Sequence, residues 1–387
     1  MRLYLTTLNP TDSVTGGFLP AAAALGWDVT ILTDQPDRYP GYDVVAADVR
    51  DPRAVIDVVA AHHRPDVIFS NSDHLQAATA LAAEYFGLPG KDWRACVTAK
   101  NKVLTRRALA AVEPVRSARI PPGANPPGDL PYPVVVKPAQ GVASEDVVLV
   151  DGADALAAAV AAIRERRPEE VLVAEEFLEG PVRTLETLGD GITREVVGGF
   201  ATTLGPLPHF VEERLDWRPP DTGHLPHLAA ALDAAGVGFG VCHTEYAVTR
   251  DGPRVIEMNY RLIGDNCDFL LADLLGVPLH QWILRVHAGE PLPAFDPGGL
   301  RAAYGSVVSL VAERSGTVTA APPGLSAQEA AGGVRLWHRA LRGIGDHVEV
   351  TGTNRDYLGL LRAVGPDGAS VDAAIDTFRK EHPWVLA

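Results

Sequence analysis

The chain is poor in cysteine and has no long apolar run. Its 387 residues include three cysteines, Cys96, Cys242 and Cys267, which are odd in number and far apart. They show neither a disulfide framework nor a metal-binding spacing, and this fits a reduced, cytoplasmic compartment. No apolar run approaches the length of a membrane-spanning helix, and residues 1–10 resemble a short strand more than a signal peptide. We therefore expect no association with a membrane.

Lysine is also scarce, and acidic residues outnumber basic ones. The formal net charge is −15, which argues against a general nucleic-acid-binding protein, because such proteins need a basic surface. A local basic site for a small anion is compatible with this charge. Beside many arginines the chain has only five lysines: Lys91, Lys100, Lys102, Lys137 and Lys380.

Strand and helix patterns alternate over the first ninety residues. Segments that read as strands are 2–8, 27–34 and 66–71, and segments that read as helices are 18–26, 54–63 and 75–87. This alternation predicts a parallel sheet with flanking helices. Gly16 and Gly17 follow the first strand, but the GxGxxG spacing of a dinucleotide site is missing, which disfavours that function.

A linker rich in Pro and Gly, residues 120–133, marks a domain boundary. The segment before it, 93–120, reads as helix followed by a short strand. After the linker most of the pattern to residue 260 is strand, with helices predicted at 153–167 and 224–236. The residues after 300 read as a smaller α+β segment.

One face of a predicted strand collects an acid, an amide and a guanidinium. In the stretch VIEMNYRLIGD, Glu257, Asn259 and Arg261 alternate with apolar residues and therefore share a face. The turn signal RDGP just upstream predicts a hairpin that places Glu245 opposite Glu257. Two such charges about 4 Å apart repel by roughly 4 kcal/mol at an effective dielectric of about 20.

Three arrangements would deal with this repulsion. The two acids would share a proton, or their carboxylates and the amide oxygen of Asn259 would bind divalent cations such as Mg²⁺, or they would be solvated and never meet. Arg261 on the same face would suit a phosphate or an acyl phosphate.

Three other stretches suit a nucleotide. Lys137 ends an apolar strand, and the loop after it contains Gly141 and Ser144, whose backbone N–H groups can cradle phosphates. Lys102 opens an amphipathic helix, and AEEFLEG, residues 174–180, would suit an adenine and its ribose. Taken singly, the Lys137 stretch is better read as a surface lysine beside a turn and AEEFLEG as a strand end with solvated acids, and the alternative for Lys102 is a solvated helix face.

Taken in order, these motifs resemble the ATP-grasp superfamily over about residues 90–300. The order is a lysine opening a helix, VVVKP with a Gly/Ser loop, EEFLEG, a Glu-bearing strand and E-x-N-x-R. Within that superfamily the chain resembles carboxylate–amine ligases, including L-amino-acid ligases and ligases of siderophore and peptide-antibiotic pathways. The resemblance implies an α/β and α+β protein with three parts. These are a Rossmann-like parallel-sheet domain at 1–92, an ATP-grasp domain at 93–300 with a lid at about 125–200, and a C-terminal α+β lobe at 301–387 with a structural or dimer-forming role.

The resemblance also implies roles for the motif residues. The ATP phosphates would be bound by Lys102, Lys137, Gly141 and Ser144, and the hinge against the adenine would be formed by Glu175, Glu176, Phe177, Leu178 and Glu179. A pair of Mg²⁺ ions would be held by Glu245, Glu257 and Asn259. Arg261, with Lys137, would stabilise the transferred phosphoryl group. Candidate substrate contacts, each of which taken singly reads as a structural residue, are His209, Glu212, His243 and Asp265.

The sequence departs from the family pattern at three places. The phosphate loop usually reads G-x-G-S-x-G, but Ala143 and Asp146 stand at glycine positions here. Val182 stands where a ribose-binding acid is often found, so Glu179 or Glu186 would have to replace it. The residues IGDNCD follow the arginine where many relatives have glycines.

The implied reaction joins a small-molecule carboxylate to an amine with ATP and Mg²⁺, through an acyl phosphate, and releases ADP and phosphate; specialised metabolism is the expected setting.

One alternative is a biotin-dependent carboxylase, whose strand also resembles E-M-N-x-R. Those enzymes carry Gln-Val-Glu-His soon after the arginine, whereas this chain has Leu262-Ile263-Gly264-Asp265. The other alternative is a nucleotide-binding protein without catalysis, which the retained metal and phosphate residues disfavour.

Overall fold

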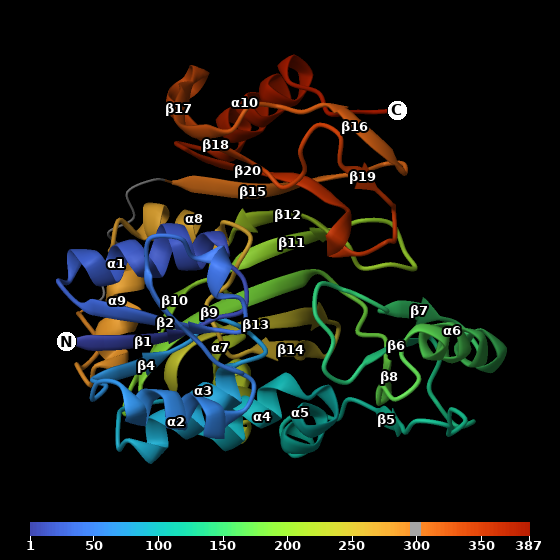
Figure 1. The fold of residues 1–387 in the computed structure, drawn as a ribbon. Helices are drawn as coiled ribbons and strands as arrows, with labels where there is room; N and C mark the ends of the chain where they lie inside the picture. The colour runs from blue at the N-terminus through green and yellow to red at the C-terminus, as the bar shows by residue number, and fades with distance from the viewer. Residues whose placement is uncertain (295–302) are drawn as a thin grey trace.

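A four-stranded parallel sheet with the order β3-β2-β1-β4 begins the chain (Figure 1, blue). The computed structural model describes residues 1–294 and 303–387. The strands of this first sheet are β1 (Arg2–Thr6), β2 (Asp28–Thr33), β3 (Asp43–Ala46) and β4 (Val67–Phe69). Leu3 and Leu5 pack toward α1 (Leu19–Ala24), whereas Tyr4 packs toward α2 (Pro52–Ala61) and α3 (Gln76–Tyr85). The predicted parallel sheet with flanking helices is confirmed.

Two helices, α4 (Trp93–Lys100) and α5 (Lys102–Leu109), connect this sheet to the next one. Asn101 separates them, because its extended backbone ends α4 while its side-chain oxygen accepts from the backbone N–H groups of Val103 and Leu104 at 3.1 and 3.3 Å. Lys102 is therefore the first residue of a capped helix, as predicted.

A small antiparallel sheet with the order β5-β8-β6-β7 projects from the side of the molecule (Figure 1, green). Its strands are β5 (Ser117–Ile120), β6 (Val134–Pro138), β7 (Val148–Val150) and β8 (Leu172–Glu176). Leu156, Val160 and Ile163 of α6 (Ala153–Arg166) pack against the apolar side chains of this sheet. This sheet and α6 cover only part of the predicted lid at about 125–200, because residues 182–200 belong to the central sheet.

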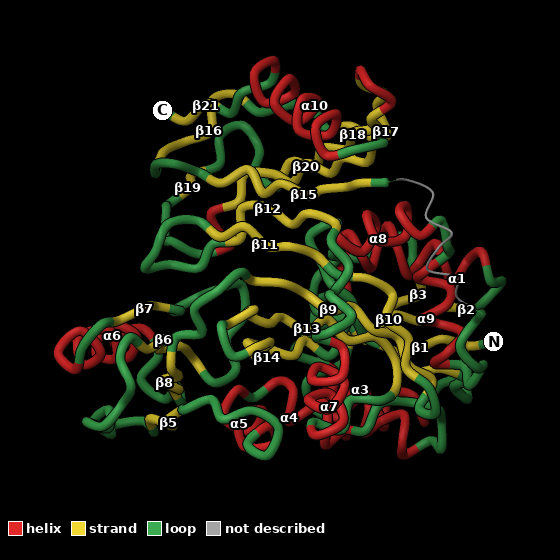
Figure 2. Tube along the Cα trace, turned by 180° about the vertical axis from the view of Figure 1, so that it is seen from behind, coloured by secondary structure: helices red, strands yellow, loops and turns green. Residues whose placement is uncertain are grey.

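The central sheet has ten strands, and it runs through the middle of the molecule (Figures 1 and 2). The order is β14-β13-β9-β11-β12-β15-β20-β18-β17, with β10 paired to β9. Its first six strands in the sequence are β9 (Val182–Asp190), β10 (Arg194–Gly198), β11 (Phe200–Leu204), β12 (Glu212–Trp217), β13 (Phe239–Thr249) and β14 (Gly252–Asn259). One helix, α7 (Leu225–Ala234), interrupts this run of strands at the predicted place, and α8 (Cys267–Leu275) and α9 (Leu279–His287) follow it.

The C-terminal segment extends the central sheet. β15 (Tyr304–Val311) pairs with β12, and β20 (Tyr357–Gly365), β18 (Val334–Ala340) and β17 (Leu325–Ala330) continue outward from it. α10 (Gly368–Glu381) packs on these strands, and a three-stranded sheet completes the segment with β16 (Gly316–Ala320), β19 (His347–Val348) and β21 (Val385–Leu386). The small α+β lobe is thus joined to the rest of the molecule by continuous strand pairing.

Within the described ranges, no helix has by itself both the length and the apolar composition needed to cross a bilayer. Taken together across a bend of 100°, α8 and α9 match such a segment in length and composition only.

Candidate active site

The hairpin of β13 and β14 places two carboxylates opposite each other, as predicted. Glu245 pairs with Glu257 and His243 pairs with Asn259 in the antiparallel register. A β-bulge follows Glu245, where the register shifts before Tyr246. The predicted register is therefore confirmed, and the two acids stand opposite each other in the hairpin.

Two cations, Lys102 from α5 and His243 from β13 itself, lie beside this pair. Lys102 Nζ lies 2.7 Å from Glu257 Oε1, and His243 Nε2 lies 3.4 Å from Glu245 Oε1. Burial alone would raise the pKa of Glu245, but the neighbouring His243, Lys102 and Arg261 lower it below its usual value. Asn259 Nδ2 also donates to Glu245 Oε1 at 3.1 Å, so the predicted metal ligands share one face.

His243 is held by a buried acid behind it. Its Nδ1 lies 2.7 Å from Glu186 Oε1, and Glu186 is fully buried. Burial would lower the pKa of His243, but Glu186 and Glu245 raise it to about 10, so the ring is a cation at neutral pH. Because Glu186 is enclosed here, Glu179, which is exposed at the end of the hinge, is the better candidate for the ribose.

Two more acids lie near His243. Asn354 Nδ2 donates to Glu212 Oε2 at 3.1 Å, and burial together with the nearby Glu245 raises the pKa of Glu212 to about 8. Asp265 has a left-handed backbone with φ 53°, and burial raises the pKa of its carboxyl although the charges of Arg261 and His243 lower it. Three of the four predicted substrate contacts are therefore brought together.

The fourth predicted substrate contact, His209, lies against a loop of the C-terminal lobe. A Cβ on Gly352 would come within 2.7 Å of its ring.

Lys137 belongs to a buried ion network that the sequence did not reveal. Its Nζ lies 2.7 Å from Glu175 Oε2, and Arg106 Nε lies 2.9 Å from Glu175 Oε1. Arg106 Nη1 also bonds Glu113 Oε1 at 2.9 Å, and the second oxygen of Glu113 accepts from the backbone N–H of Val255 at 3.1 Å. Burial would raise the pKa of Glu175, but the two cations lower it to about 2.

This network changes the expected role of Glu175. Its carboxylate is bonded to Lys137 and Arg106 and is not free to face an adenine; its side chain instead fixes Lys137. The neighbouring hinge residues Glu176, Phe177 and Leu178 are half-buried, and Phe177 lies 6.3 Å from the ring of Phe210. Glu176 ends β8 and the other two residues follow it, and their contact with an adenine stays a prediction. The sequence did not predict Arg106 or Glu113 as site residues. The helical pattern TRRAL is compatible with an exposed as well as a buried Arg106.

The loop between β6 and β7 keeps a glycine-like backbone without the glycines. Ala143, Ser144 and Asp146 all have positive φ, at 57°, 54° and 58°. Side chains in this region cost about 1–2 kcal/mol each, so the surroundings must hold the loop in shape. Gly141 accepts a bond from Lys102 Nζ at 3.4 Å through its carbonyl, and the Lys102 backbone N–H donates to the Ala139 carbonyl at 2.9 Å.

Contacts from outside the loop provide that support. Asp146 pairs with Arg167, the residue after α6, at 3.0 Å, and Glu145 pairs with both Arg167 and Arg355 at 2.6 Å. The Asn354 N–H donates to the Ala143 carbonyl at 3.0 Å. Arg355 and Asn354 of the C-terminal lobe therefore help to hold the loop between β6 and β7 in place.

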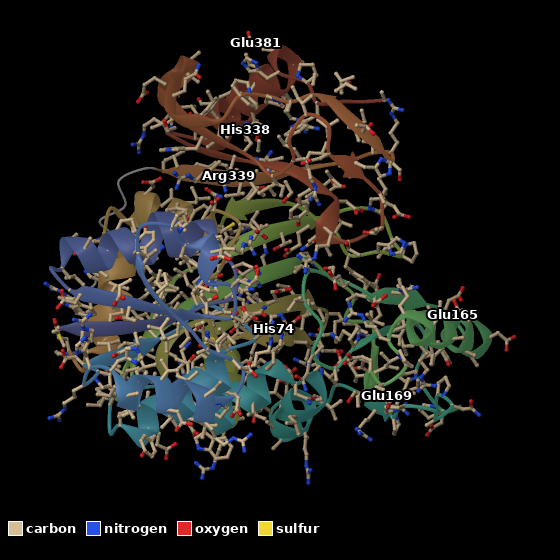
Figure 3. All side chains as sticks on the ribbon, in the orientation of Figure 1. His74, Glu165, Glu169, His338, Arg339 and Glu381 are labelled. Atoms are coloured by element: carbon tan, nitrogen blue, oxygen red, sulfur yellow. The ribbon has the colours of Figure 1, made fainter. Side chains whose placement is uncertain are left out.

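The carboxyl end of the first parallel sheet also reaches the site. Asp73, in the loop after β4, forms an ion pair with Lys100, and Arg261 and Lys100 lower the pKa of Asp73 despite its burial. Figure 3 shows the adjacent residue, His74, at the centre of the molecule, where the first domain faces the central sheet. Open parallel sheets present binding loops at this edge.

No family model matches the chain. The uncharacterized protein y4rH of Sinorhizobium fredii is 29% identical over 343 residues, which cover 83% of this chain and 68% of that protein.

Solved structures show the same architecture. An L-amino acid ligase from Bacillus licheniformis matches with a TM-score of 0.83 at 21% identity, covering 100% of this chain and 98% of that one. Phosphoribosylglycinamide synthetase from Anaerococcus prevotii matches with 0.71 at 13% identity, covering 100% and 99%. Biotin carboxylase from Campylobacter jejuni matches with 0.69 at 14% identity, covering 100% and 92%. The protein has the ATP-grasp fold, so the fold that the order of the motifs implied is confirmed.

Proposed function

We propose that the protein is an ATP- and Mg²⁺-dependent ligase that joins a carboxylate to an amine. The observation that carries this proposal is the facing arrangement of Lys102, Glu257 and Glu245, with Asn259 on the same side. It unites a phosphate-binding cation with hard oxygen ligands on adjacent strands. The likeness to the L-amino acid ligase, at a TM-score of 0.83, supports the same assignment.

The residues present fit Mg²⁺. Two carboxylates and an amide oxygen on neighbouring strands are ligands of the kind that this ion prefers. Among the described residues no cluster of three or more His, Cys, Asp and Glu side chains is arranged for a metal, so the amide of Asn259 is needed to complete the set. When bound, Mg²⁺ would neutralise charge on the ATP phosphates and orient them.

In the first proposed step, an oxygen of the substrate carboxylate attacks the γ-phosphorus of ATP, the bond to the β-phosphate oxygen breaks, and ADP leaves. Lys102 and Lys137 bind the phosphates, and Glu175 keeps the Lys137 ammonium in place. Arg261, which lies on the metal side of the site, stabilises the transferred group. These roles are electrostatic and positional, which suits phosphoryl transfer.

In the second step, the amine lone pair attacks the acyl carbonyl carbon, the bond to the phosphate oxygen breaks, and inorganic phosphate leaves as the nitrogen loses a proton. Glu212, His243 and Asp265, with His209, are the proposed contacts for the two substrates. The closed loop between β6 and β7 would exclude water that hydrolyses the acyl phosphate.

Nucleotide analysis tests the proposal. Purified protein with ATP and Mg²⁺ would be given amino acids, hydroxy acids and polycarboxylates, singly and in pairs. We expect ADP and phosphate only with a particular pair, together with a product lighter than the two substrates by one water. AMP and pyrophosphate would contradict the proposal, and ADP formation that needs bicarbonate and free biotin would favour a carboxylase instead.

A further inference from the structure

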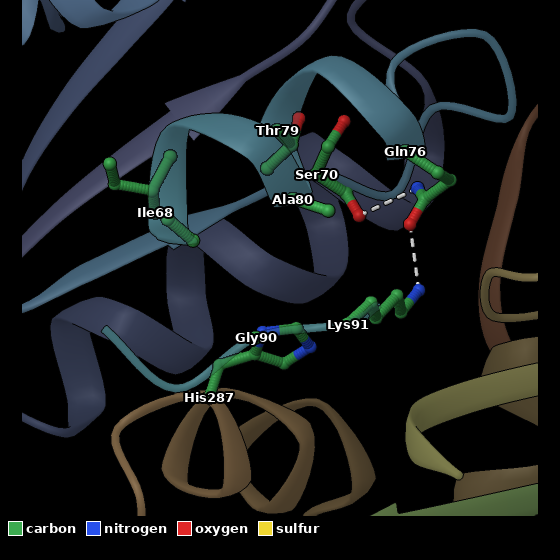
Figure 4. A pocket seen from close by; sticks show the side chains of 9 residues that line it. Ile68, Ser70, Gln76, Thr79, Ala80, Gly90, Lys91 and His287 are labelled. Carbon is green, nitrogen blue, oxygen red and sulfur yellow. Dashed lines mark hydrogen bonds between the residues drawn. The ribbon is translucent and has the colours of Figure 1, made fainter. Parts of the chain in front are cut away.

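Lys91 is a buried lysine that lies outside the nucleotide site. It is only 7% exposed and lies between α3 and α4. Its Nζ donates to Gln76 Oε1 at 2.7 Å and to the backbone carbonyl of Tyr260 at 2.5 Å, and it lies 4.4 Å from the centre of the Tyr260 ring. Figure 4 shows the ammonium group reaching toward Gln76 beside His287. One side chain thus joins the first domain to the end of the metal-binding strand.

The surroundings make this lysine costly to bury. Within the described residues no carboxylate lies at ion-pair distance from Lys91, and burial lowers its pKa to about 8. A cavity of about 10 Å³, lined partly by Ser70, Thr79 and His287, lies next to it. An apolar side chain of similar length would fill the space at lower cost, so packing alone does not explain the ammonium group.

Gln76 links Lys91 to a loop of the first domain. Its Nε2 donates to the carbonyls of Ser70 and Ser72 at 3.0 and 2.9 Å, which fixes the turn after β4. In that turn the side-chain oxygen of Asn71 accepts from the backbone N–H of Leu262 at 3.0 Å. The loop fixed by Lys91 and Gln76 therefore also bonds the chain beyond β14.

The two contacts lie on either side of Arg261. Lys91 bonds the carbonyl of residue 260, and Asn71 bonds the N–H of residue 262. The strand pairing of β14 has ended by Asn259, so these groups of the first domain replace the missing ladder. The Lys91 side chain is closely packed against Gly240, because a Cβ at residue 240 would come within 2.9 Å of Lys91 Cε.

We propose that Lys91 is a positioning residue for Arg261: with Gln76 and Asn71 it clamps the backbone on both sides of the arginine and so aims the guanidinium at the transferred phosphoryl group. This inference rests on the proposed ligase function. The groups that bind ATP, Lys102, Lys137 and the hinge, lie on other elements, so loss of the clamp slows the chemical step and leaves ATP binding intact.

Hydrogen exchange tests the clamp without any substrate. In Lys91→Met, which keeps the length of the side chain, we expect exchange in peptides covering 70–73 and 259–263 to rise about tenfold, while strands β6 and β8 change by less than about twofold. Lys380→Met, in the exposed last turn of α10, is the matched control. Unchanged exchange at 259–263, or an equal rise in every strand, would overturn the proposal.

Kinetics supply the second readout. In Lys91→Met we expect kcat for ADP formation to fall at least about tenfold with the KM for ATP within about twofold of the native value, which a general loss of structure would not produce. An unchanged kcat contradicts the clamp. If the native protein turns over no substrate pair, the ligase proposal fails while the exchange result still decides the clamp. If Lys91→Met does not fold, Gln76→Leu, which breaks the same connection, is read by the same two measurements.

Discussion

The amino group of Lys102 lies 2.7 Å from Glu257, and this contact links α5 to strand β14, which carries two of the proposed metal ligands. The same ammonium group approaches the Gly141 carbonyl at 3.4 Å. Burial would lower the pKa of Lys102, but the carboxylate of Glu257 raises it above its usual value, so the side chain stays charged although it is 5% exposed. Loop, lysine and acid therefore form one unit, and changing any of them alters the place that ATP would occupy.

Removing the charge of Glu257 tests this unit. In Glu257→Gln, Lys102 loses its counter-ion and the metal face loses a carboxylate ligand, so we expect kcat/KM for ATP to fall at least about 100-fold, equivalent to about 2.7 kcal/mol. The measurement is steady-state ADP release over a range of Mg²⁺ concentrations. Glu195→Gln, at an exposed position on β10, is the control and should behave like the native protein. Native-like turnover in Glu257→Gln would exclude the predicted role.

The cap of α5 should affect nucleotide affinity as well as stability. Asn101→Ala removes the bonds to Val103 and Leu104, and we expect it to cost about 1 kcal/mol of unfolding free energy and to raise the KM for ATP several-fold, because Lys102 is the next residue. Asp367→Ala is the matched control. It removes the cap bond of Asp367 to the Ser370 N–H at 2.8 Å on α10, and it should cost a similar free energy without changing KM. Equal KM values in the two variants would contradict the account.

The buried network around Glu175 predicts a definite pH dependence of stability. The folded pKa of Glu175 is about 2, below its ordinary value of 4.5, so its stabilising contribution is present above about pH 4.5 and is lost as the pH falls toward 2. A shift of this size corresponds to roughly 3 kcal/mol. Urea unfolding of Glu175→Gln and the native protein should differ most above pH 5 and converge in acid. Glu165→Gln, at an exposed position on α6, should show no difference, and a gap for Glu175→Gln that does not change with pH would argue against the network.

The contact between Glu145 and Arg355 should act on water exclusion more than on stability. Both side chains are partly exposed, so we expect Arg355→Ala to change the unfolding free energy by less than about 1 kcal/mol. Release of the phosphate loop should let water reach the acyl phosphate and raise the amount of ADP formed per product molecule. Arg53→Ala removes an exposed pair with Asp51 far from the loop, so its ratio of ADP to product should stay native. A native ratio of ADP to product in Arg355→Ala as well would show that the contact between Glu145 and Arg355 does not protect the acyl phosphate.

The sequence predicted local features better than it predicted contacts between distant segments. The register of Glu245 against Glu257 follows from a turn signal and the two-residue period of strands, which are both local. Glu175 pairs with Arg106, from a helix, and with Lys137, from another strand. These segments are far apart in the chain, and no spacing rule predicts that they meet. The positive φ of Ala143 could not be predicted from the sequence either, because the glycine that usually indicates this conformation is absent.

The activation of a carboxylate by ATP is the central claim, and transfer of oxygen tests it most directly. With the substrate pair found by nucleotide analysis, the carboxylate would be labelled with ¹⁸O and the released phosphate examined by mass spectrometry. Attack of a carboxylate oxygen on the γ-phosphorus predicts that each phosphate released carries one oxygen from the acid. Unlabelled phosphate, with the label found in AMP or retained wholly in the product, would contradict the acyl-phosphate route.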